Sequence, residues 1–139
     1  MSAAVLDTHV LVWLLGGDRR LGPSSRALIA DASRGAGAVF SAISGREIAM
    51  LVAEGRLALD RDVLVWLEAV ARLPGLGVHP LSPVVSVDST RLPGDLHGDP
   101  ADRLIVATAR HVGAPLVTAD RALLDYAAAG HVKVQPARD

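Results

Sequence analysis

The 139-residue sequence contains no cysteine, which excludes disulfide frameworks, thiol catalysis and zinc sites with cysteine ligands. Aromatic residues make up only 3% of the chain, so a base-stacking platform like that of single-strand-binding proteins is not expected. Lysine occurs once, at Lys133, and the formal net charge of -1 argues against a strongly basic, non-specific nucleic-acid binder. A secretory signal is not expected, because the N-terminus has no basic n-region and no cleavage site, and no apolar run is long enough to span a membrane. We therefore expect a cytoplasmic protein with no membrane partner.

Apolar residues, by contrast, are abundant: half of the chain is hydrophobic and only 21% is charged. A chain of 139 residues is long enough to bury one good core, and no linker or internal repeat divides it. We therefore predict a single domain over residues 1–139. The high apolar fraction also suggests that a partner covers part of its surface.

Short apolar strands alternate with helices along the whole chain. Strands are predicted at residues 3–6, 38–41, 78–81, 115–118 and 132–134, and helices at 8–15, 24–33, 44–54, 60–72, 83–90, 100–112 and 121–128. This alternation predicts an α/β fold with a mainly parallel, roughly five-stranded sheet and helices on both faces, which is a three-layer α/β/α sandwich.

Four acidic residues lie at points where an apolar strand or loop gives way to a helix. They are Asp7, Glu47, Asp102 and Asp120. In a parallel sheet, the sites where strands pass into helices gather along one edge, where ligands of open α/β folds bind. We therefore expect the four side chains to share one site.

Each acid taken singly also has a local explanation, because acidic side chains accept backbone hydrogen bonds at helix N-termini. Ser44 and Glu47 have the spacing of a capping box. Asp99 and Pro100 have the pattern of an N-cap followed by proline at the first helical position, with Asp102 in the first turn. Whether Glu47 binds a metal or only caps its helix stays open at this point.

The four acids together favour a cation. Two ionised carboxylates about 5 Å apart repel by roughly 3 kcal/mol at an effective dielectric constant near 20. Six such pairs exceed the roughly 5–15 kcal/mol that stabilises a domain. The acids are therefore farther apart, partly protonated or gathered around a cation. Oxygen ligands without cysteine suit Mg²⁺, or Mn²⁺, better than zinc.

Four segments carry a resemblance to a known family: VLDTH (5–9), SAISGREI (41–48), HGDPADRLI (97–105) and LVTAD (116–120). In their order and spacing they resemble PIN-domain ribonucleases, and among these the VapC-type toxins of bacterial toxin–antitoxin pairs. The combination of DPxDR with a later TxD is the most specific element. Together the segments span nearly the whole chain, so the resemblance implies a PIN-like fold throughout.

The resemblance implies a Mg²⁺-dependent endoribonuclease, with Mn²⁺ as a second possible cofactor. It implies that the four acids Asp7, Glu47, Asp102 and Asp120 are catalytic and bind the metal, with Asp99 as an auxiliary ligand. The implied substrate is cellular RNA (tRNA, rRNA or mRNA), whose cleavage inhibits translation and growth. The implied partners are a cognate antitoxin and a second copy of the chain, in a homodimer or a toxin–antitoxin hetero-oligomer. Which RNA is cut and whether one or two metal ions act are left open.

Other polar residues stand beside the acids. Thr8, Ser44 and Thr118 carry hydroxyl groups that would hold the carboxylates in place from a second layer. Arg46, Arg103 and His97 are candidates for contact with substrate phosphates. For the arginines, pairing with acids or with solvent is an equal alternative, and for His97 the alternative is a hydrogen-bonded loop histidine.

Two other functions share some of these sequence features. A phosphatase of the haloacid-dehalogenase type needs a second aspartate two residues after the first, where this chain has His9, and a lysine that Lys133 alone would have to supply. A non-catalytic PIN-like module that binds RNA or protein remains the alternative. Such a module would have no reason to bear the repulsion of four clustered acids.

Overall fold

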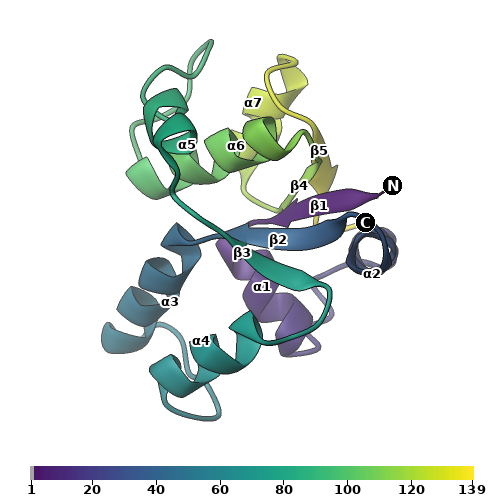
Figure 1. Cartoon of the computed structure of the whole chain (residues 1–139), viewed down its shortest axis with the longest axis vertical. Helices are drawn as coiled ribbons and strands as arrows, with labels where there is room; N and C mark the ends of the chain where they lie inside the picture. Colours follow the sequence, from purple (N-terminus) through teal and green to yellow (C-terminus); the bar gives the residue numbers. More distant parts are fainter. Residues whose placement is uncertain (1) are drawn as a thin grey trace.

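The computed structural model describes residues 2–139 and consists of a five-stranded sheet between two layers of helices (Figure 1). The strands are β1 (Ala3–Leu6), β2 (Gly37–Ser41), β3 (Leu76–His79), β4 (Leu116–Thr118) and β5 (Val134–Pro136). The helices are α1 (Thr8–Leu15), α2 (Pro23–Arg34), α3 (Ile43–Ala53), α4 (Val63–Ala71), α5 (Pro83–Asp88), α6 (Pro100–Val112) and α7 (Arg121–Ala128). All neighbouring strands are parallel, so the predicted α/β/α sandwich is confirmed.

The strand order β3-β2-β1-β4-β5 places the first strand in the centre of the sheet. The chain builds outward from β1 to β2 and β3, and then returns to the other side of β1 with β4 and β5. The direction of winding therefore reverses between β1 and β4, where Leu6 lies opposite Val117. A reversal of this kind leaves a crevice outside the carboxyl ends of the two strands. Asp7 follows β1 directly at that point.

Alternating side chains of the central strands fill the two halves of the core, because successive residues of a strand point to opposite faces. Leu6 and Phe40 pack with the buried side chains of α1 to α4, which lie below the sheet in Figure 1. Val5 and Leu116 pack with the buried side chains of α5 to α7, which lie above it. Both layers are apolar at the sheet, which explains why the strands read as short continuous apolar runs.

Predicted and observed boundaries differ most at the two edge strands. The strand predicted at 78–81 lies at Leu76–His79, and the strand predicted at 132–134 lies at Val134–Pro136. Pairing with the neighbouring strand sets these limits, since Leu76 lies opposite Ala38. Pro80 lies just beyond β3 and Pro136 ends β5, and proline is tolerated at such edge positions because one side of the strand needs no donor. The helix predicted from residue 60 begins at Val63, because Asp62 is its cap and accepts a hydrogen bond from the Leu64 N–H.

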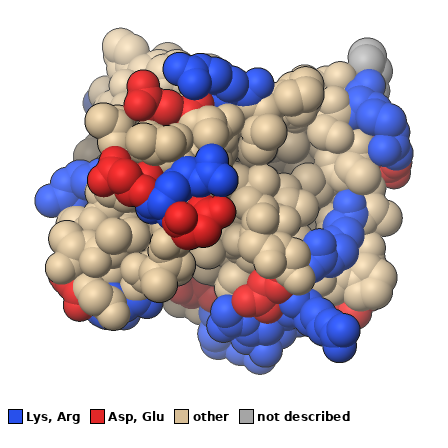
Figure 2. Space-filling view, turned by 90° about the horizontal axis from the view of Figure 1, so that it is seen from below, with Lys and Arg blue, Asp and Glu red and all other residues tan. Residues whose placement is uncertain are grey.

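Several large apolar side chains remain exposed. They belong mainly to α4, β3 and α5: Leu64, Val65, Val78, Val84 and Val87. Figure 2 views the side of α1 to α4 and shows a broad area of uncharged residues, with charged side chains around the outline and one charged group near the middle of the view. Among the described residues, no helix has the length and apolar character needed to cross a bilayer.

Two leucine substitutions test the placement of the core. Leu116 in β4 is fully buried, so Leu116→Ala is expected to lower the free energy of unfolding by about 2–5 kcal/mol. Leu64 in α4 is 63% exposed, so Leu64→Ala is expected to change it by less than about 0.5 kcal/mol. Urea denaturation of both variants measures the difference. Equal effects at the two positions would contradict the packing described.

Candidate active site

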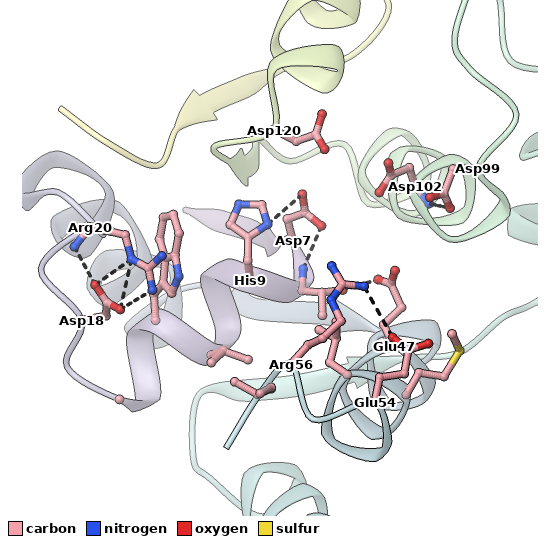
Figure 3. Close-up of a pocket in the computed structure, with 17 residues that line it drawn as sticks. Asp7, His9, Asp18, Arg20, Glu47, Glu54, Arg56, Asp99, Asp102 and Asp120 are labelled. Carbon is pink, nitrogen blue, oxygen red and sulfur yellow. Dashed lines mark hydrogen bonds and ion pairs between the residues drawn. The ribbon is translucent and has the colours of Figure 1, made fainter. Parts of the chain in front are cut away.

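A pocket of about 600 Å³ lies at the carboxyl ends of the central strands (Figure 3). Its walls come from α1, from α3, from the N-terminal ends of α6 and α7, and from the loops that follow α1 and α3. The five predicted acids all line it: Asp7, Glu47, Asp99, Asp102 and Asp120. The structure thus brings together side chains that are separated by more than a hundred positions in the sequence.

Asp7 is the most firmly held of these acids. Its side chain is the N-cap of α1, and Oδ1 accepts a hydrogen bond of 2.8 Å from the backbone N–H of Thr8. Oδ2 accepts a hydrogen bond of 2.7 Å from the hydroxyl of Thr118. Nδ1 of His9 lies 3.6 Å from the same oxygen, and Nε2 of His9 accepts a hydrogen bond from the backbone N–H of Ala119. Because Nε2 is an acceptor, the ring proton is on Nδ1 and faces Asp7.

Thr118 joins two of the acids. It is the last residue of β4, is fully buried, and donates its hydroxyl proton to Asp7. Its oxygen accepts a hydrogen bond of 3.0 Å from the backbone N–H of Asp120. Asp120 is in turn the N-cap of α7 and accepts from the Leu123 N–H. The Thr118 hydroxyl therefore fixes the carboxylate of Asp7, after β1, relative to the backbone of Asp120, after β4. This is the supporting role that was predicted for Thr118.

The predicted capping box at Glu47 is wrong. α3 begins at Ile43, with Ala42 as an N-cap that has helical backbone angles and no side-chain cap, so Ser44 already lies inside the helix. Glu47 instead accepts a hydrogen bond of 2.6 Å from the Thr8 hydroxyl, which lies 2.8 Å from the Ser44 hydroxyl. Since Thr8 has one hydroxyl proton and gives it to Glu47, Ser44 donates to Thr8. Glu47 is thus directed into the pocket rather than back to its own helix.

The predicted cap at the start of α6 is confirmed. Asp99 accepts hydrogen bonds from the backbone N–H groups of Ala101 and Asp102, at 2.9 and 3.3 Å, and Pro100 occupies the first helical position. His97 lies against this turn: Nε2 is 3.3 Å from Oδ2 of Asp102, and Nδ1 accepts from the Asp99 N–H. His97 therefore contacts an acid of the site from outside the pocket lining.

The carboxylates affect one another's ionisation. Burial, together with the charges of Asp7, Asp99, Asp120 and Glu47, raises the pKa of Asp102 from 3.8 to about 7, and burial is the largest cause. The pKa of Glu47 is raised as well, mainly by burial, although the hydrogen bond from Thr8 opposes the shift. The predicted repulsion is therefore present, and near neutral pH partial protonation of Asp102 relieves it.

Two predicted phosphate contacts are not brought into the pocket. Arg103 points away from it, because its Nε donates to the carbonyl of Ser89 and its Nη1 to the carbonyl of Leu96. Arg46 is exposed on α3 and lies beside the sulfur of Met50. Phosphate contact by Arg103 is therefore corrected, since its donors are held by carbonyl groups. Arg46 is exposed beside Met50, which lines the pocket, so substrate contact by Arg46 stays a prediction.

The pocket contains two other arginines that the sequence patterns did not single out, Arg20 and Arg56. Both lie in loops, two residues after an acid: Arg20 follows Asp18 and Arg56 follows Glu54. In the sequence, the two arginines share one signal, an acid-x-Arg spacing after a helix. Only the fold shows that both loops border the same pocket.

Comparison with known proteins agrees with this geometry. The PIN domain family model matches residues 4–129. The chain belongs to the PIN domain family. It is similar to "Ribonuclease VapC22" of Mycobacterium tuberculosis (strain ATCC 25618 / H37Rv), with 39% identity over 127 residues, which cover 91% of this chain and 93% of that protein. The predicted resemblance to VapC-type PIN proteins is confirmed.

Solved structures share the fold at low sequence identity. VapBC2 from Rickettsia felis, bound to a DNA fragment from their promoter, superposes with a TM-score of 0.68 at 16% identity, covering 96% of this chain and 97% of that one. A toxin–antitoxin complex from Klebsiella pneumoniae gives 0.65 at 19% identity, covering 98% of both chains. FitAcB from Neisseria gonorrhoeae gives 0.61 at 23% identity, covering 96% of both. The PIN-like architecture predicted for this chain is thus confirmed.

The raised pKa of Asp102 predicts a specific pH dependence of stability. The folded chain holds the Asp102 proton more tightly than the unfolded chain does, so the resulting stability is present below about pH 4 and is lost as the pH rises through about 7. In the presence of EDTA, the stability of the wild type relative to Asp102→Asn should fall by on the order of 2–4 kcal/mol between about pH 4 and pH 8. Urea denaturation at a series of pH values measures this difference.

The matched control is Asp125→Asn, since Asp125 is exposed on α7. This variant should keep the wild-type pH dependence. An Asp102→Asn protein whose stability follows the same pH curve as the wild type would show that Asp102 is an ordinary surface acid.

Proposed function

We propose that this chain is a Mg²⁺-dependent endoribonuclease, the cytoplasmic toxin of a toxin–antitoxin pair, which cleaves cellular RNA and so inhibits translation and growth. The observation that carries the proposal is the convergence of five acids on a single pocket, four of them from the starts of three helices (α1, α6 and α7) and one, Glu47, from within α3. The relative named Ribonuclease VapC22 supports the activity, and the VapBC and toxin–antitoxin complexes among the similar structures support the biological setting.

The acids fit a hard divalent cation. All the converging donors are carboxylate oxygens, which suit Mg²⁺ or Mn²⁺. Asp7, Asp102 and Asp120 are the proposed direct ligands, with Glu47 and Asp99 as further ones. Within residues 2–139, no three side chains already stand at the spacing of a formed metal site, so the carboxylates would move together on binding. Binding would also remove the mutual repulsion that raises the pKa of Asp102.

When bound, the cation would polarise the scissile phosphate and lower the pKa of a coordinated water. The protein contributes orientation. Thr118 and the Thr8 N–H hold both oxygens of Asp7, and Thr8 holds Glu47 through its hydroxyl. Glu47 is therefore placed to orient the attacking water or to bind a second ion. Ser44 supports this arrangement from below by donating to Thr8.

The proposed partners are a cognate antitoxin and a second copy of the chain, in a homodimer or a toxin–antitoxin hetero-oligomer. The large apolar side chains exposed on α4, β3 and α5 support such an assembly, because exposed apolar surface can mark a contact with a partner. β3 is also an edge strand, so its outer side is free of sheet pairing within the described chain.

Substitution of the acids tests the catalytic assignment. Asp7→Asn, Asp102→Asn and Asp120→Asn are each expected to lower the rate of RNA cleavage at least about 100-fold, because each removes a negatively charged metal ligand while keeping the shape of the side chain. Cleavage of total cellular RNA in Mg²⁺, followed by gel analysis, measures the rate. Asp125→Asn is the control and should cleave at the wild-type rate, since Asp125 is exposed on α7 outside the pocket.

Thermal unfolding should confirm that each variant is folded. Full Mg²⁺-dependent cleavage by any one of the three asparagine variants would refute its role as a ligand.

Metal binding can be measured without any substrate. At a Mg²⁺ or Mn²⁺ concentration ten times the dissociation constant, the folded state gains about 1.4 kcal/mol, which corresponds to an increase in Tm of roughly 4–6 °C for a chain of this length. Asp7→Ala should abolish the shift. A wild-type Tm that is unchanged by millimolar metal would instead favour the non-catalytic PIN-like module that binds RNA or protein.

A further inference from the structure

The acid-lined pocket also contains an arginine on each of two sides. Seven acidic residues and two arginines, Arg20 and Arg56, line it, so its formal charge is strongly negative. An RNA strand is itself a polyanion, and cations bound by the acids would neutralise only the phosphate at the centre. Phosphates on either side of that point need positive charge from the protein.

Arg20 is held in a defined orientation on one side of the pocket. Its Nε and Nη2 donate to the carboxylate of Asp18, at distances down to 2.7 Å, and its guanidinium lies 4.7 Å from the centre of the Trp13 ring. The guanidinium of Arg138 lies 5.4 Å from the same ring. Among the described residues, Nη1 of Arg20 donates no hydrogen bond, and the side chain is 55% exposed. A pre-oriented guanidinium with free donors is suited to a phosphate.

Arg56 reaches the pocket from another element. α3 ends at Ala53, and Gly55 has a positive φ of 72°, which turns the chain so that Arg56 extends over the Glu47 side of the pocket (Figure 3). Its contact with Glu54 is long, at 3.4 Å, and its side chain is 69% exposed. Arg20 follows a similar turn at Gly17, with a φ of 63°, after α1. Two helix-ending glycines thus direct two arginines to the same pocket.

Most other arginines are engaged elsewhere. Arg26 and Arg103 donate to backbone carbonyl groups, and Arg110 donates to Asp88 and to the His131 carbonyl. Arg61 forms an exposed pair with Asp60 outside the pocket. Arg20 and Arg56 are therefore distinguished from the other arginines by their place in the lining of the pocket.

We propose that Arg20 and Arg56 bind the backbone phosphates of an RNA strand on two sides of the acid cluster. Arg20 contacts the strand beyond His9 and Trp13, and Arg56 contacts it beside Glu47. This inference rests on the proposed ribonuclease function and adds the path of the substrate across the pocket. Its ligand class is a single-stranded RNA backbone, since the contacts are to phosphate and carry no base readout.

The salt dependence of RNA binding tests the proposal. Binding of a fluorescein-labelled, ten-nucleotide single-stranded RNA of mixed sequence is measured by anisotropy in EDTA, which prevents metal-dependent cleavage. Each phosphate contact releases about 0.7 counterions from a single strand on binding, so the loss of a contact makes the slope of log K against log salt concentration shallower by about that amount. The slope is therefore expected to become shallower by about 0.7 in Arg20→Gln, by about 0.7 in Arg56→Gln and by about 1.4 in the double variant. Arg61→Gln, which removes an arginine outside the pocket, should keep the wild-type slope.

Two further variants separate direct contact from net charge. Asp18→Asn/Arg20→Gln and Glu54→Gln/Arg56→Gln each remove an acid together with its arginine and so leave the net charge unchanged. Direct phosphate contact predicts that both keep the shallower slope. A return to the wild-type slope in these charge-neutral variants, or wild-type slopes in the single arginine variants, overturns the proposal while leaving the nuclease function in place. A wild-type chain that neither binds this RNA nor cleaves cellular RNA would overturn both.

Discussion

The site depends on the pairing of β1 with β4. Backbone hydrogen bonds from Val5 to Pro115 and from Asp7 to Val117, at 2.9 and 3.0 Å, set the register of these two strands at the point where the winding of the sheet reverses. That register places Thr118 beside Asp7, so that one hydroxyl group contacts the carboxylate after β1 and the backbone of Asp120. A shift of the register would separate these groups, because the side chains of a strand alternate between faces.

This arrangement carries an energetic penalty within the free protein. Burial and the neighbouring carboxylates both oppose the ionisation of Asp102, as its pKa of about 7 indicates, so the ionised acids oppose folding. The surrounding structure bears the penalty because both layers of the core pack firmly against the sheet and the hydroxyls of Thr8, Ser44 and Thr118 are fully used in hydrogen bonds. Functional sites of this type are positioned by rigid elements and are relaxed by the ligand they bind.

Local patterns were sufficient to predict the fold and the gathering of the acids, because both depend on which segments are strands and on where helices begin. They were insufficient for side-chain directions. Glu47 has a complete local partner in Ser44, yet Thr8, which is brought near by the packing of α1 against α3, binds it instead. The edge strands β3 and β5 were misplaced for a related reason: pairing with a neighbour, rather than their own apolar residues, sets their limits.

The arginines show most clearly what depends on tertiary structure. Arg103 belongs to the motif DPADR, but its bonds to the carbonyls of Ser89 and Leu96 fasten the segment that precedes α6. It therefore positions Asp99 and Asp102 by holding the loop from which their helix begins. The arginines that line the pocket, Arg20 and Arg56, lie outside the motifs, in the loops after α1 and α3. Because those loops lie on the surface, their length and charge can change without disturbing the acids. Such a division would allow related chains to keep the acid site while the charge around its pocket changes.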